Sequence, residues 1–119
     1  MQEFPAEDVL GFLIALEVAN VIFQPYSIDI GFTDGTYLVC EHKIEYVGED
    51  GASHQIDIQK RRLGPVCLHE FVGRHIEGIV RDSFLLTLRF NGDWMLKIYS
   101  IPGPLESGHF SHAGEVIVF

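Results

Sequence analysis

Apolar and polar residues alternate in two stretches of the chain, residues 26–40 and 84–98, and each stretch is interrupted by a tight turn. The turn residues are Thr33-Asp34-Gly35 in the first stretch and Asn91-Gly92-Asp93 in the second. Alternation with a period of two around residues that favour turns is typical of a β-hairpin. The sequence therefore predicts two β-hairpins of the same design.

The apolar pattern of the first half recurs in the second half. Placing Phe32 on Phe90 sets an offset of 58 in the numbering, and the same offset matches apolar positions along most of the chain. This match predicts an internal repeat within a single domain, residues 1–119, with halves at about 6–59 and 66–119 and a linker at about 60–65. The offset also places His54 on His112, which predicts that the two histidines meet near a pseudo-symmetry axis.

The segments around the hairpins complete the predicted fold. Residues 6–14 and 66–72 follow Pro5 and Pro65, and because proline favours the first turn of a helix, we expect a short helical turn in each. Further strands are predicted at residues 17–23, 43–47, 54–59, 75–81, 106–111 and 115–119. The fold class expected is α+β with mainly antiparallel β-structure, formed either as one curved sheet or as two packed sheets.

Composition and charge narrow the class of protein. Of 119 residues, 47% are hydrophobic and 21% are charged, which is typical of a globular domain, and no apolar run reaches the length of a membrane span. The first residues are acidic and lack the basic start of a secretory signal, so a cytoplasmic location is expected. The net charge of -9 argues against nucleic acid as a partner and favours a basic protein.

The negative charge is concentrated in one half of the chain. Residues 1–59 contain eleven acidic residues and one basic residue, Lys43, whereas residues 60–119 contain six acidic and seven basic residues. The asymmetry predicts an acidic surface in the first half, and Glu45, Glu49 and Asp50 are the residues expected to meet a basic partner. Trp94 and Tyr99 are the aromatic residues expected to anchor that partner, because aromatic side chains are enriched at interfaces.

The histidines and cysteines are the residues considered for a pocket, a nucleophile or a metal site. His42, His54 and His112 are candidates to line a pocket between the two halves. Cys40 and Cys67 are expected to be buried free thiols, and no histidine is placed to activate either as a nucleophile. His109 and His112 point to opposite faces of a strand, so the spacing disfavours a shared metal. No metal site, cofactor or catalytic residue is predicted.

A family resemblance rests on Leu68–Arg74, Leu86–Gly92, Leu96–Ser100 and Leu105–Gly108. These segments resemble small uncharacterised bacterial proteins with an LxLxF motif, an Asp-Gly turn, an LxI motif and a Glu-Ser pair. The second half departs from that pattern, because Asn91-Gly92-Asp93 takes the place of the Asp-Gly turn. Since some of those proteins are encoded near polymorphic-toxin genes, the resemblance implies an immunity-like role.

Two functions follow from these observations. The first is a non-catalytic protein-interaction module, of the immunity or inhibitor type, that presents an acidic surface to a basic protein and dimerises through a sheet edge. The alternative is a small-ligand-binding or enzymatic domain with a pocket between the two halves.

Overall fold

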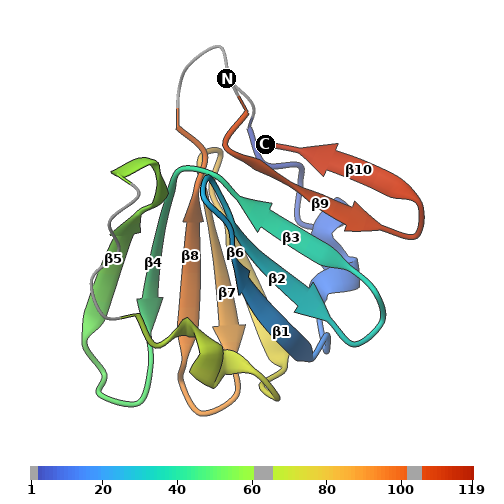
Figure 1. The fold of residues 1–119 in the computed structure, drawn as a ribbon. Coiled ribbons are helices and arrows are strands. Elements are labelled where there is room, and N and C mark those ends of the chain that lie inside the picture. The colour runs from blue at the N-terminus through green and yellow to red at the C-terminus, as the bar shows by residue number, and fades with distance from the viewer. Residues whose placement is uncertain (1–2, 61–65, 102–105) are drawn as a thin grey trace.

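The computed structural model describes residues 3–60, 66–101 and 106–119, and these form two five-stranded antiparallel sheets. The strand order is β1-β2-β3-β9-β10 in one sheet and β5-β4-β8-β7-β6 in the other (Figure 1). The strands are β1 (Val18–Phe23), β2 (Ile28–Phe32), β3 (Tyr37–Cys40), β4 (Lys43–Val47), β5 (Ser53–Asp57), β6 (Ile76–Arg81), β7 (Leu85–Phe90), β8 (Met95–Tyr99), β9 (Gly108–His112) and β10 (Glu115–Val118).

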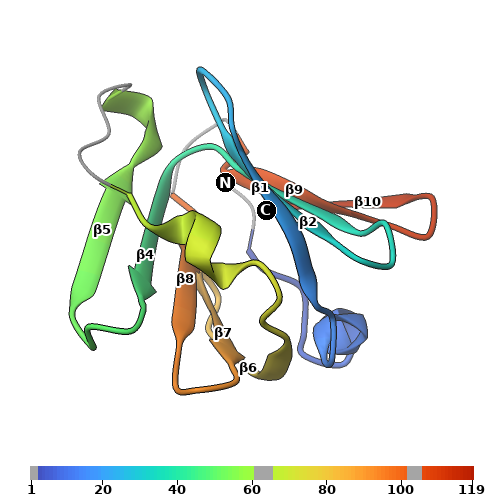
Figure 2. The ribbon, with the colours of Figure 1, turned by 60° about the horizontal axis from the view of Figure 1, so that its bottom comes forward.

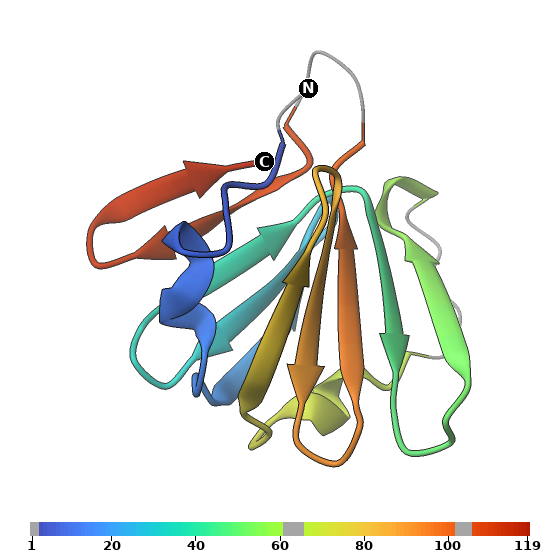
Figure 3. The ribbon, with the colours of Figure 1, turned by 180° about the vertical axis from the view of Figure 1, so that it is seen from behind.

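Each sheet takes strands from both halves of the chain. After β3 the chain crosses to the other sheet, where β4 pairs with β8, and after β8 it crosses back, where β9 pairs with β3. Figure 3 shows the crossing from β3 to β4 at one end of the two sheets. The two halves are therefore linked by an exchange of hairpins, β4–β5 for β9–β10.

The core lies between the inner faces of the two sheets. Alternate residues of the two predicted hairpins are buried and face this core: Ile28, Ile30, Phe32, Leu38 and Cys40 in one, and Leu86, Leu88, Phe90, Leu96 and Ile98 in the other. Period-two alternation buries one face of each sheet, and two such faces pack into a sandwich. The two hairpins and the mainly antiparallel β-structure predicted from the sequence are confirmed, with two packed sheets as the arrangement.

The sheets are joined where β1 and β6 begin. The Val18 N–H donates to the Arg74 carbonyl, and the Ile76 N–H donates to the Leu16 carbonyl, each over 2.9 Å. The offset of 58 exchanges these two bonds, because it carries Val18 to Ile76 and Leu16 to Arg74. The irregular pairing after Val18 in β1 also recurs after Ile76 in β6.

The α+β assignment is wrong. The segments predicted as helical turns form short 3₁₀ turns, η1 (Val9–Leu13) and η3 (Leu68–Phe71), and the described residues contain one other, η2 (Ile58–Lys60). Their bonds span three residues, as from the Ile14 N–H to the Gly11 carbonyl. Segments of four or five residues are too short to repay the cost of nucleating an α-helix, so the tighter turn forms instead.

The match of His54 with His112 is also wrong for the folded chain. Val47 of β4 pairs with Met95, and Ser111 of β9 pairs with Tyr37. Tyr37 and Met95 are related by the offset of 58, but Val47 and Ser111 are related by an offset of 64. Strands β4 and β9 therefore correspond at this larger offset, because the chain before β9 is longer than the chain before β4.

Most of the predicted linker lies outside the described residues. Its residues 61–65 are not among them, whereas residue 60 ends η2. Within the described ranges, no helix has the length and apolar character needed to cross a membrane.

Candidate functional site

A cleft of about 420 Å³ lies between the β4–β5 hairpin, η3 and the β7–β8 turn. It takes residues from both halves of the sequence: Tyr46, Gly48, Glu49, Asp50, His54, Cys67, Glu70 and Trp94. Figure 2 shows η3, in yellow-green, crossing near the ends of β4 and β8. The volume falls within the range of pockets that bind small molecules.

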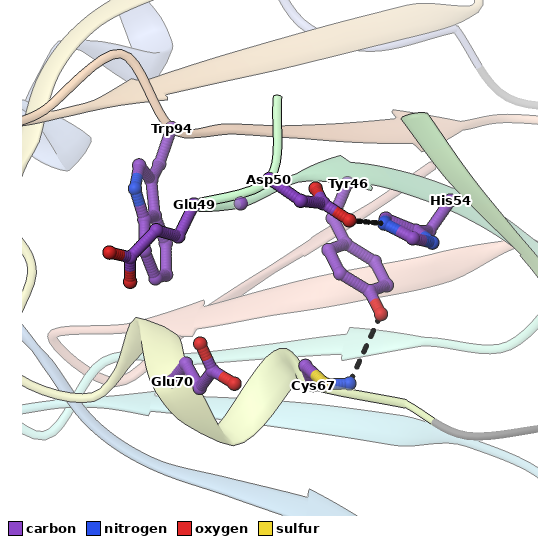
Figure 4. Close-up of a pocket in the computed structure, with 8 residues that line it drawn as sticks. Tyr46, Glu49, Asp50, His54, Cys67, Glu70 and Trp94 are labelled. Carbon is purple, nitrogen blue, oxygen red and sulfur yellow. Dashed lines mark hydrogen bonds and ion pairs between the residues drawn. The ribbon is translucent and has the colours of Figure 1, made fainter. Parts of the chain in front are cut away.

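One wall of the cleft is a set of stacked rings. The Tyr46 and His54 rings lie 5.0 Å apart between centroids at 22°, and the Tyr46 hydroxyl accepts a hydrogen bond from the Cys67 N–H over 3.1 Å. His54 Nε2 lies 2.8 Å from Asp50 Oδ2, and this hydrogen bond lowers the pKa of Asp50 (Figure 4). The wall therefore holds the Asp50 carboxylate in its charged form.

Trp94 lines the cleft and is only 6% exposed. Its ring packs edge-on against Phe71 with centroids 5.0 Å apart, and the Arg74 guanidinium lies 3.7 Å above its centroid. Arg74 in turn donates to the Asn91 carbonyl over 2.8 Å. Because its ring is already packed, Trp94 forms a wall of the cleft and exposes little surface, and its role as an anchor for a partner stays a prediction.

Three carboxylates surround the opening. Glu49, Asp50 and Glu70 are exposed, and Figure 4 shows Glu49 and Glu70 reaching toward the same space from the hairpin and from η3. None of the described residues that line the cleft is a lysine or an arginine. The cleft is consequently a concentrated negative site suited to a cationic group.

Cys67 is exposed at the cleft, contrary to the expectation that it is buried, whereas Cys40 is buried as expected. Desolvation and the neighbouring Glu70 carboxylate raise the pKa of the Cys67 thiol. A reactive cysteine needs the opposite environment, with a cation that lowers the thiol pKa. The surroundings of Cys67 therefore favour an unreactive thiol.

Cys67 is expected to react with iodoacetamide more slowly than an unperturbed thiol at neutral pH. The E70Q variant removes one cause of the raised pKa and should speed the reaction by up to about tenfold, the change for one pKa unit. Mass spectrometry of the labelled peptides measures this rate, with E77Q as the matched control. An unchanged rate in E70Q would show that the carboxylate does not act on the thiol.

Glu45 and Tyr99 lie away from the cleft, on the outer face of the β5-β4-β8 strands. Glu45 is 9% exposed and accepts hydrogen bonds from the Ser53 hydroxyl over 2.5 Å, Gln55 over 3.2 Å and the Tyr99 hydroxyl over 3.3 Å. Lys97 lies 3.7 Å from it, and the Ser53 bond is the main reason that its pKa is lowered. This carboxylate is compensated within the chain, so Glu45 and Tyr99 are not brought together with Glu49, Asp50 and Trp94.

The three histidines predicted to line one pocket are separated. His54 lines the cleft, whereas His42 lies in the crossing between β3 and β4, where its carbonyl accepts from the Ile58 N–H. His112 is in the other sheet, with its Nδ1 2.7 Å from the Thr36 hydroxyl. Different sheet positions give each histidine its own partners.

A smaller cluster lies where the chain crosses between the sheets. Glu41, Glu106 and His109 each have an atom that can ligate a metal, and these three atoms lie within 4.8 Å of one another. His109 Nδ1 is 3.7 Å from Glu106 Oε2. His109 therefore neighbours carboxylates instead of sharing a site with His112.

The sequence pointed to Glu49, Asp50, His54 and Trp94 but missed Tyr46, Gly48 and Glu70. Tyr46 follows the alternation of β4 and reads as core, while Gly48 reads as an ordinary turn residue. Only the folded position of η3 brings Glu70 opposite the hairpin. Comparison with protein-family models, with curated proteins and with solved structures gave no match.

Proposed function

We propose that the chain is a non-catalytic protein-interaction module that uses its acidic cleft to bind a basic protein. The observation that carries this proposal is the group of three exposed carboxylates, Glu49, Asp50 and Glu70, around a cleft lined by no described lysine or arginine. Complementary charge steers a basic partner to such a surface and sets its orientation.

The chemistry of the cleft supports binding over catalysis. The Cys67 thiol has a raised pKa, and His54 is hydrogen-bonded to Asp50 while stacked on Tyr46. A nucleophile needs a lowered pKa or a base within hydrogen-bond reach, with a third group to orient that base. The groups in the cleft instead provide fixed negative charge beside a rigid aromatic wall.

The wider proposal includes the immunity-like role that the bacterial family resemblance implies, with the interaction in the cytoplasm. We also infer that the two halves are an internal repeat, supported by the hydrogen bonds that exchange at an offset of 58 between Val18 and Ile76. Dimerisation through an edge strand is part of the same proposal. The strands β1, β5, β6 and β10 end the two sheets and offer those edges.

The combined variant E49Q/D50N/E70Q should weaken binding of an oligo-lysine peptide by about tenfold or more at low salt, because charge-assisted contacts are lost. Isothermal titration calorimetry at two salt concentrations measures both the affinity and its salt dependence. The matched control D57N/E77Q/E115Q removes three exposed carboxylates that do not line the cleft.

Equal losses in the two variants would indicate attraction to net charge alone and would contradict a role for the cleft. The alternative function, binding of a small cationic molecule, is favoured by the cleft volume of about 420 Å³. A cationic metabolite that binds more tightly than any basic peptide would support that alternative over the interaction module.

A further inference from the structure

The space that corresponds to the cleft in the other half of the molecule is filled by side chains. There the Phe12 ring stacks on the His112 ring, with centroids 4.1 Å apart at 15°, and it also meets Phe110 edge-on at 6.2 Å. The Thr36 hydroxyl lies 2.7 Å from His112 Nδ1 and fixes the imidazole. Two flat rings thus occupy this position.

Pairing registers identify the matching residues at the cleft. Tyr46 pairs with Leu96 as Phe110 pairs with Leu38, so Tyr46 takes the place of Phe110. Two residues after Tyr46 and Phe110, respectively, Gly48 takes the place of His112. At the offset of 58 that relates η1 to η3, Glu70 takes the place of Phe12.

The cleft therefore exists because two ring positions have lost their rings. Gly48 supplies no side chain, and Glu70 supplies a carboxylate where the other half supplies a phenyl ring. Tyr46 is only 4% exposed and is covered by the stacked His54 ring, whose side chain is 42% exposed and forms the accessible aromatic wall. The resulting space accepts a flat group beside an aromatic ring and close to negative charge.

We propose that the cleft receives a single arginine side chain from the basic partner. This inference rests on the proposed function and names the group that the partner inserts. A guanidinium is planar, stacks on aromatic rings and forms paired hydrogen bonds with a carboxylate. Lysine carries the same charge as a compact ammonium, which matches neither the flat shape of the space nor paired bonding to Glu49 or Glu70.

Gly48 offers a direct way to close the site. A Cβ built at Gly48 meets no atom within 4 Å, and its backbone is not in the left-handed region. The substitution Gly48→His restores the ring that the other half carries at His112, and Glu70→Phe restores the ring of Phe12. Neither change removes a buried side chain, because both positions border the open cleft.

The test uses end-blocked Gly-Arg-Gly and Gly-Lys-Gly peptides as probes, titrated into the full chain and followed by the fluorescence of Trp94, the single tryptophan. The arginine peptide should bind about tenfold more tightly than the lysine peptide, the difference made by one charge-assisted hydrogen bond. G48H and G48H/E70F should abolish this preference, whereas V116A, altered at an exposed residue of β10, should retain it.

The outcomes separate this inference from the proposed function. Equal affinity for both peptides, together with loss of binding in E49Q/D50N/E70Q, overturns arginine insertion and leaves the acidic interaction surface intact. Binding that survives G48H/E70F also overturns insertion, provided that circular dichroism and the melting temperature of the variant match those of the parent. Binding that neither set of variants changes contradicts both proposals.

Discussion

Replacing Phe110 by alanine is expected to lower the free energy of unfolding by about 3–5 kcal/mol, the range for truncating a fully buried phenylalanine. Phe110 has no exposed surface, and its ring contacts Phe12 and Phe119 at centroid distances of 6.2 and 5.7 Å. Loss of the ring removes buried apolar surface and leaves a cavity beneath η1. The predicted cost is a large fraction of the stability of a single domain.

Urea denaturation followed by circular dichroism measures the effect of F110A, with V116A as the matched control. Val116 is 63% exposed on β10, so its truncation should change the free energy by no more than about 0.5 kcal/mol. A similarly small change in the free energy of unfolding of F110A would contradict the packing of Phe110 against Phe12 and Phe119. Because Phe110 takes the place of Tyr46 in the pairing register, the comparison also measures how much a ring at this position stabilises the fold.

Replacing Gly108 by alanine is expected to destabilise the fold by about 1–3 kcal/mol, as for other overpacked sites. A Cβ at this position would overlap the Val39 carbonyl oxygen and would lie 2.5 Å from the Phe119 ring. The carbonyl belongs to β3, which pairs with β9 through Cys40 and Gly108, so the methyl group can fit only if the two strands move apart.

The matched control for G108A is G11A, because a Cβ at Gly11 meets no atom within 4 Å. Thermal unfolding of both variants should show a lowered midpoint for G108A and little change for G11A. Equal midpoints would contradict the close approach of β9 to β3.

The β-hairpins were predictable because their signals are local. Alternation and a turn such as Thr33-Asp34-Gly35 specify a hairpin without reference to the rest of the chain, and Asp34 stabilises the turn by accepting a hydrogen bond from the Thr36 N–H. The helical turns were predicted in the right places but in the wrong form. Proline marks where a turn begins, but the few residues that follow cannot sustain an α-helix.

The exchange of hairpins could not be predicted, because strand pairing depends on contacts between distant residues. A constant offset of 58 places His54 on His112, yet the extra chain before β9 shifts that strand to an offset of 64. Register decides which residues face each other, so the correspondence of Gly48 with His112 appears only in the folded chain. This is why Glu49 and Asp50 of the cleft were predictable, whereas Glu70 and the opening itself were not.

The positions of the predicted interaction residues along β4 explain which of them lie together. Glu45 was predicted from charge alone, but it alternates with Tyr46 on β4 and therefore faces away from the cleft, toward Ser53 and Lys97. Glu49 and Asp50 follow the end of that strand and reach the opening. Position within a strand, which charge counts ignore, separates these residues.

We expect a basic group to enter the cleft between Gly48 and Glu70, and nuclear magnetic resonance can detect this entry residue by residue. Titration of the labelled protein with the end-blocked Gly-Arg-Gly peptide should shift the amide signals of Gly48, Asp50 and Glu70 and the indole N–H signal of Trp94, the only tryptophan. Signals from β10 should not move. Shifts confined to residues outside the cleft would contradict entry of the basic group. Equal binding of the peptide by the parent protein and by E49Q/D50N/E70Q would contradict it as well.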